Sequence, residues 1–243
     1  LKRIAEVATF LVPLMGSIYF GAMLIALILN LDLVLPAFKL ILVDAFNGTA
    51  VAGGTFFGVL IYGVRRGAFS NEAGMGTESL VHGVAKVSNP VKQGLVAMTG
   101  PIFDTLIICT ATALMILVSG VWETSSSQGV TLTAEAFSNL LGNFGGLILF
   151  TCVICFGLST IFTYSYYGAS CSRFLFGNFG MKFYIYLYIF SIFIYSIVPI
   201  DIAINIADGA FALMAIPTLI SALWLAPKVM QASKNYFKLV DNI

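Results

Sequence analysis

The stretch Gly63–Leu80 concentrates residue types that can do chemistry within an otherwise apolar chain. It reads GVRRGAFSNEAGMGTESL, with two arginines, two glutamates and an asparagine, although only 9% of the chain is charged and 59% is hydrophobic. Its glycines permit non-helical backbone, and Ser70 and Asn71 are residue types that begin helices. We therefore expect a short helix from about Ser70 to Lys86. Free N–H groups at such a helix start can hold an anionic group such as a carboxylate.

The same stretch has a plainer interpretation as the end of a membrane span. Arg65 and Arg66 would then mark the cytoplasmic surface, and SNEAG would begin an ordinary loop. The broken-helix interpretation is favoured, because two short helical halves separated by glycines are typical of substrate sites in transporters. Ionisable residues at membrane depth are also costly, which makes them candidates for a functional role.

A second group of polar residues lies in an apolar run of the C-terminal half. The segment LSTIFTYSYYG places Thr160, Tyr164 and Tyr167 on one helix face, with Ser159 and Thr163 on the neighbouring face. A helix face that contacts only lipid has no use for so many hydroxyls. Their oxygens have lone pairs that can bind a cation such as Na⁺. The alternative is that the Ser and Thr hydroxyls donate back to helix carbonyls, as they often do in membrane spans.

The elements that position these residues are long apolar segments. Mean hydropathy is +0.99 and aromatic residues make up 14% of the chain, whereas a soluble domain carries about 25% charged residues. Uncharged runs of about 18 residues or more are long enough to cross the hydrocarbon core as helices. These runs are continuously apolar, whereas strands of a membrane β-barrel alternate apolar with polar residues. The sequence therefore predicts an all-α polytopic membrane helix bundle.

We expect a single transmembrane domain over residues 1–243, with about six crossings. The crossings are expected at 4–29, from about 48 into the glycine-rich stretch, and at 94–121, 145–171, 182–198 and 202–226. An interfacial helix is expected at 33–46 and a cytoplasmic tail at 227–243. The polar segment ETSSSQGVTLTAEAF is expected to form a loop on the outer side.

Basic and acidic residues alternate between successive connections. Arg173 and Lys182 lie between the fourth and fifth expected spans, and lysines follow the last, whereas the opposite connections carry mainly Asp and Glu. Loops rich in Lys and Arg face the cytoplasm, so both the first residue and the C-terminus are expected there. The net charge of +1 is uninformative, and we expect no nucleic-acid partner.

The cysteines and the start of the chain suggest two further expectations. Cys152 and Cys155 form a C-x-x-C pair, a spacing that can indicate metal or redox chemistry. No second pair and no nearby histidine accompany it, so we interpret the thiols as packing residues and expect no metal and no cofactor. Because the sequence starts at Leu1 close to a membrane span, we expect a fragment of a longer protein.

Five motifs together resemble the alanine or glycine:cation symporter family. They are GVRRGAFSNEAGMGTESLVHG, NPVKQG, FDTLIICTATALMIL, STIFTYSYYG and IADGAFALMAIPTLI, and RGAFSNEAGMG within the first is highly specific. The resemblance implies the second half of a LeuT-type inverted-repeat transporter, with a discontinuous helix near Gly67–Gly74 and with the N-terminal half of the protein missing. It also implies a small amino acid substrate, Na⁺ as coupling ion, and a lipid bilayer that is a bacterial or archaeal plasma (inner) membrane.

The resemblance further implies a substrate site at the helix break. Phe69, Ser70, Asn71 and Ala73 are the residues we expect there. Main-chain groups would bind the amino and carboxylate groups of the substrate, and Phe69 would close the pocket. Simple packing against lipid or core is the alternative for Phe69. Tyr164 stands where the family usually has Trp, in a position expected to wall the substrate pocket.

The cation site is also expected from the resemblance. LeuT-type carriers hold one Na⁺ between their first and eighth core helices, so Ser159 and Thr160 are the expected cation ligands. The chain departs from the family pattern at positions that bear on substrate identity and activity. The departures are Thr163-Tyr164 in place of Gly-Trp, Ala169-Ser170 in place of Glu-Arg, and Pro217-Thr218-Leu219 in place of Pro-Asn-Leu.

Charged residues are candidates for a gate. Asp104 could pair with Arg65 or Arg66 as part of an inner gate, or the pair could serve as a static anchor at a helix end. Asp208 is a candidate gate or ion-path carboxylate, with an intrahelical hydrogen bond as the alternative.

The predicted function is sodium-coupled symport of a small neutral amino acid, alanine or glycine, across the plasma membrane by alternating access. One alternative is a fragment that transports nothing. Another is a passive channel-like protein, but such a pore needs repeated filter elements or charged rings, and none is visible. An enzyme is not expected, because the sequence has no H-E-x-x-H, G-x-S-x-G or paired-Asp motif.

Overall fold

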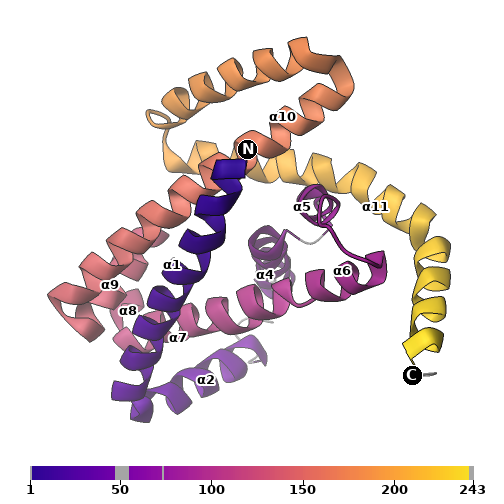
Figure 1. Ribbon diagram of the computed structural model, residues 1–243. Helices are drawn as coiled ribbons and strands as arrows, with labels where there is room; N and C mark the ends of the chain where they lie inside the picture. Colours follow the sequence, from indigo (N-terminus) through magenta and orange to yellow (C-terminus); the bar gives the residue numbers. More distant parts are fainter. Residues whose placement is uncertain (1, 47–54, 73, 241–243) are drawn as a thin grey trace. The chain divides into compact units, whose positions relative to one another are not determined.

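The computed structural model describes residues 2–46, 55–72 and 74–240, and every regular element within them is helical. Helix bounds follow the apolar segments of the sequence, and short helices fill the more polar connections (Figure 1). The elements are α1 (Lys2–Leu29), α2 (Leu31–Phe46), α4 (Thr55–Asn71), α5 (Thr77–His82), α6 (Pro90–Ala97), the π-helical segment η1 (Ile102–Cys109), α7 (Thr110–Ser119), α8 (Val121–Thr124), α9 (Val130–Leu141), α10 (Asn143–Tyr195) and α11 (Ile200–Val240).

The chain divides into two compact units. The first comprises residues 1–61 and 106–181, and its helices α1, α2, α7 and α9 pack against one another (Figure 1). Met23, Met115 and Phe137 form the fully buried centre of this packing. The Tyr19 ring stacks on Phe137 with ring centroids 5.5 Å apart, and its hydroxyl lies 3.0 Å from Oγ1 of Thr112. The buried hydroxyl is thus satisfied inside an apolar core, as buried polar groups require.

The second unit comprises residues 62–105 and 182–243. It contains the last turns of α4, then α5 and α6, and the whole of α11. Within it, α6 contacts both α5 and α11. Most of the large apolar side chains of α11 are exposed, such as Leu223 at 77% and Trp224 at 80%. An exposed face this apolar suits a lipid solvent and would be unfavourable in water.

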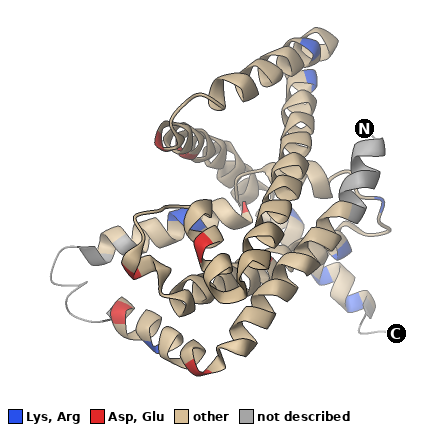
Figure 2. Cartoon of the chain, turned by 90° about the vertical axis from the view of Figure 1, so that its left-hand side faces the viewer, with Lys and Arg blue, Asp and Glu red and all other residues tan. Residues whose placement is uncertain are grey.

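Four helical stretches in the described part of the chain are long and apolar enough to cross a membrane, namely 11–29, 90–119, 143–195 and 200–239. The stretch 143–195 contains two of the expected crossings, because α10 changes direction at Gly177, whose backbone is non-helical (φ 68°, ψ −157°). Figure 2 shows long uncharged stretches of helix, with Lys, Arg, Asp and Glu gathered at intervals. These features make the chain an all-α polytopic membrane protein.

Two expectations about helix bounds are wrong. The segment 123–137 was expected to be a polar loop on the outer side, but α9 occupies 130–141 and buries Ala136 and Phe137. Polar composition hid the one-sided apolar spacing that lets this short helix pack. Likewise, no new helix begins at Ser70. Helix α4 continues through Ser70 to Asn71, and α5 begins only at Thr77.

Candidate functional site

The connection between α4 and α5 has left-handed backbone at three positions. Glu72 has φ 53°, Gly74 has φ 81° and Gly76 has φ 93°. A left-handed residue cannot continue a right-handed helix, which explains why α4 ends here despite the helix-starting residues Ser70 and Asn71. The N–H of Met75 donates to the carbonyl of Glu72 over 3.0 Å, closing a tight turn. The helix end is therefore built by glycine and backbone conformation.

Close packing against α11 accounts for one of these glycines. A methyl group on Gly76 would lie 2.7 Å from Oγ1 of Thr218, which is nearer than a carbon and an oxygen can approach. The next residue, Thr77, is 2% exposed, and its buried Oγ1 has no hydrogen-bond partner among the described residues. A buried hydroxyl without a partner is unusual, and composition alone did not single it out.

The fold of the second unit brings Ser70 and Asp104 together. The Ser70 hydroxyl donates to Oδ2 of Asp104 over 2.5 Å, and Thr105 Oγ1 lies 3.4 Å from the same oxygen. Asp104 stands in the first turn of the π-helical segment η1, and such segments are frequent at functional sites. This contact joins the last turn of α4 to the start of the next apolar stretch.

The arginines do not make the expected pair with Asp104. Arg65 pairs with Asp208 of α11, and Arg66 lies over the ring of Tyr62, with 5.1 Å between its guanidinium carbon and the ring centroid. Sequence could not select between two carboxylates for two adjacent arginines. The helical rotation between Arg65 and Arg66, about 100° per residue, sends them to different neighbours.

Phe69 packs against an aromatic side chain of α11. Its ring meets Phe211 edge to face, with centroids 4.8 Å apart and an interplanar angle of 84°. Asn71 is half-buried at the end of α4. Ala73, also expected in the substrate site, lies outside the described residues.

Ser159, Thr163 and Tyr164 lie on the part of α10 that belongs to the first unit. Ser159 Oγ donates to the carbonyl of Phe156 over 2.9 Å, and Thr163 Oγ1 donates to the carbonyl of Ser159 over 2.8 Å. Helix back-bonding is thus present at Ser159, as the alternative interpretation holds. A hydroxyl that donates one hydrogen bond still has lone pairs for a cation. Tyr164 lies beside Tyr167, with ring centroids 5.5 Å apart.

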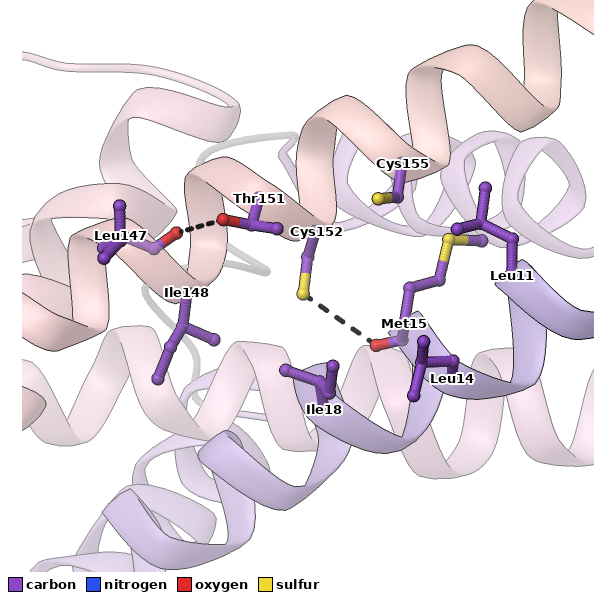
Figure 3. A pocket seen from close by; sticks show the side chains of 9 residues that line it. All are labelled: Leu11, Leu14, Met15, Ile18, Leu147, Ile148, Thr151, Cys152 and Cys155. Atoms are coloured by element: carbon purple, nitrogen blue, oxygen red, sulfur yellow. Dashed lines mark hydrogen bonds between the residues drawn. The ribbon is translucent and has the colours of Figure 1, made fainter.

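An open groove of about 280 Å³ lies between α1 and α10 in the first unit (Figure 3). Its polar atoms are already used, because Thr151 donates to the carbonyl of Leu147 over 2.9 Å and the Cys152 thiol faces the carbonyl of Met15 at 3.8 Å. A groove lined this way offers nothing to the charged groups of an amino acid. Its lining residues are Leu11, Leu14, Met15, Ile18, Leu147, Ile148, Thr151, Cys152 and Cys155.

Comparisons with known proteins give the identity of the chain at family level. Among curated relatives, the sodium/alanine symporter AgcS of Methanococcus maripaludis is 34% identical over 100% of this chain and 54% of its own length. The probable sodium/glutamine symporter GlnT of Bacillus subtilis is 33% identical over 97% of this chain and 49% of its own. The sodium/proton-dependent alanine carrier protein of Bacillus sp. strain PS3 is 32% identical over 68% of this chain and 40% of its own.

These relatives are named as transporters and not as enzymes. The chain spans about half the length of the curated relatives it matches, the sodium/alanine symporter AgcS among them. The family model matches residues 1–242. A match of this extent, together with relatives above 30% identity over nearly the whole chain, shows that the chain belongs to the sodium:alanine symporter family.

Proposed function

We propose that the protein carries out sodium-coupled symport of a small neutral amino acid, alanine or glycine, across a bacterial or archaeal plasma membrane by alternating access. The family match over residues 1–242 is the observation that carries this proposal. The name of the AgcS relative supports alanine as a substrate and sodium as the coupling ion, although GlnT is named for glutamine. The chain acts in a LeuT-type fold, within a multi-pass protein whose C-terminus is cytoplasmic.

The substrate site in this proposal is the end of α4 and the turn after it. Phe69, Ser70, Asn71 and Ala73 present main-chain groups to the amino acid. The left-handed backbone of Glu72, Gly74 and Gly76 supports this role, because it separates the end of α4 from the start of α5. In transporters, substrate sites typically lie where a membrane helix is interrupted, and we propose the same arrangement here.

The cation site is proposed at Ser159 and Thr160, whose hydroxyl oxygens coordinate Na⁺. Arg66 and Asp104 are proposed to act in the gate, and Arg65 in an ion pair. The bond from Ser70 to Asp104 supports a gate adjoining the substrate segment, since Asp104 then responds to movement of the last turn of α4. Na⁺ and the amino acid stabilise the same conformation, and their binding is therefore mutually favourable.

Uptake by the full-length protein in sealed vesicles tests this function. Labelled alanine and glycine are offered with an inward Na⁺ gradient, with a choline gradient, and with a proton gradient alone. Accumulation above the outside concentration only with Na⁺ is the expected result. Accumulation driven by protons alone would show that H⁺, and not Na⁺, is the coupling ion. The proton gradient is included because the strain PS3 relative is named as sodium/proton-dependent. Equilibration without any gradient dependence would favour the passive, channel-like alternative and reject symport.

Variants of α10 test the cation ligands. Removing an oxygen ligand weakens cation binding without touching the substrate groups, so Ser159→Ala and Thr160→Val should raise the Na⁺ concentration for half-maximal uptake. Thr151→Val is the matched control, because its hydroxyl lies on the same helix and bonds to Leu147. An equal Na⁺ requirement in all three variants would remove Ser159 and Thr160 from the cation site.

A further inference from the structure

The end of α4 and the turn that follows it lie along one face of α11. Arg65 pairs with Asp208, and four residues later Phe69 meets Phe211 at 4.8 Å. Beyond the turn, Gly76 lies against Thr218 of the same helix. Residues three and four apart share a helix face, so these contacts form one continuous interface with an ion pair at one end.

The ion pair is asymmetric in its burial. The side chain of Asp208 is 4% exposed, whereas that of Arg65 is 48% exposed. Apart from Arg65, neither carboxylate oxygen of Asp208 has a hydrogen-bond partner in the described part of the chain. A carboxylate buried in a membrane protein without its counter-charge is strongly unfavourable. The free-energy cost of separating α4 from α11 therefore arises mainly from the buried Asp208 carboxylate, because the Arg65 side chain is already half-exposed.

We propose that Asp208 is a positioning residue for the substrate segment, acting through Arg65. The pair fastens the last turns of α4 to α11, with the Phe69–Phe211 contact one turn further on. Residues 69–71 consequently keep a fixed position relative to α11 while the protein cycles, and α11 moves together with the end of α4. This inference rests on the proposed function, because the substrate role of residues 69–71 belongs to that proposal.

A double-mutant cycle in the full-length protein tests the pair. Arg65→Gln leaves the buried Asp208 carboxylate without a counter-charge, so it should lower the Tm in detergent by more than the double variant Arg65→Gln/Asp208→Asn does. Arg65→Lys keeps the charge and should restore most of the Tm. Asp201→Asn is the matched control, because Asp201 lies exposed in the first turn of the same helix. Additive effects in the cycle would overturn the proposal.

Kinetics separate positioning from plain stabilisation. Misplacing the substrate segment weakens substrate binding, so Arg65→Gln and Asp208→Asn should each raise the KM for amino acid uptake by about tenfold, which is the effect of losing roughly one well-oriented contact. The maximal rate should change less, Arg65→Lys should recover most of the wild-type KM, and Asp201→Asn should leave KM unchanged. Unchanged KM in both single variants, even with a coupled loss of Tm, would reduce the pair to a structural role and reject positioning.

The two readouts also distinguish this inference from the proposed function. Thermal unfolding needs no substrate, so the cycle reports on the pair even if no amino acid is taken up. Absence of gradient-driven uptake in the wild-type protein would reject both the proposed function and the positioning role that rests on it. The Tm cycle would then still measure whether Arg65 and Asp208 stabilise the fold as a pair. Sodium-driven uptake together with an additive cycle would reject the positioning role alone.

Discussion

Gly76 meets two constraints that no other residue type satisfies together. Its φ of 93° lies in the left-handed region, and a methyl group there would lie 2.7 Å from Oγ1 of Thr218. Backbone strain of this kind costs about 1–3 kcal/mol. The buried Thr77 follows directly, so any shift of the turn to relieve the contact moves the start of α5.

Gly76→Ala should therefore destabilise the full-length protein by about 1–3 kcal/mol, through strained φ and the contact with Thr218. Thermal unfolding in detergent measures the change. Gly94→Ala is the control, because Gly94 lies inside α6 with nothing within 4 Å of the added methyl, and alanine in a helix is favoured over glycine by about 0.5–1 kcal/mol. Equal Tm values for the two variants would contradict a constrained turn.

Glu135 titrates in an environment that favours its charged form. Hydrogen bonds from the Ser125 and Ser127 side chains hold the pKa of Glu135 below its usual range, and the Ser127 hydroxyl donates to it over 2.6 Å. Because the folded pKa is lowered, the stabilisation is complete above the unfolded value of about 4.3 and is lost as pH falls through the folded pKa.

Protection of the amides of residues 125–135 against hydrogen exchange should accordingly decrease as pH falls below about 4.3. Protection is the intrinsic exchange rate divided by the observed rate at the same pH. Glu135→Gln removes the titrating carboxylate, so this variant should show no such decrease over the same range. Ser127→Ala should shift the transition to higher pH, since it deletes one of the hydrogen bonds that lower the pKa of Glu135. A transition at the same pH in Ser127→Ala and wild type would contradict this assignment.

At the scale of elements, sequence predicted the helical class and most of the long helices. The reason is that lipid leaves few alternatives for a continuously apolar run, and α1 follows such a run closely, while α2 covers the interfacial helix expected at 33–46. Helix ends were harder to predict. Ser70 and Asn71 are good helix starters but lie in the last turn of α4, because the left-handed turn that ends the helix comes after them. Local side-chain preference was overridden by backbone conformation.

Contacts between distant segments could not be predicted from sequence. The pairing of Arg65 with Asp208 instead of Asp104 depends on which face of α4 meets α11. A single sequence gives the helical period but no information on which helices are neighbours. Ser70 and Asp104 could be recognised as candidates by type, yet their hydrogen bond follows only from the packing.

Gly177 sets the direction of α10. Its φ of 68° and ψ of −157° lie in a region essentially confined to glycine, where other residues are strained by about 1–3 kcal/mol. Gly177→Ala should therefore lower the Tm in detergent, because alanine must either keep the strained backbone of the bend or straighten the helix there. Gly157→Ala lies earlier in the same helix with nothing within 4 Å of the added methyl, and should be neutral or stabilising. Equal loss in both variants would show that the bend does not need glycine.

At the scale of the whole molecule, the charge pattern makes a prediction about orientation. Arg173 and Lys182 flank the bend of α10, and the end of α11 carries Lys228, Lys234 and Lys238. Connections rich in Lys and Arg stay in the cytoplasm. Helix α11 is long enough to extend beyond the membrane, because 41 residues at about 1.5 Å each exceed a hydrocarbon core of about 30 Å.

Cysteine labelling in intact cells measures this orientation. In a background without the four native cysteines, Ser126→Cys, Asn178→Cys and Asn235→Cys each place one exposed thiol in a connection or tail. A membrane-impermeant maleimide should label Ser126→Cys in intact cells, because its connection is expected on the outer side. The other two should react only after permeabilisation. Labelling of Asn235→Cys in intact cells would place the C-terminus outside. Labelling of Asn178→Cys in intact cells would place the bend of α10 outside. Uptake measured for each variant confirms that the labelled protein is correctly inserted.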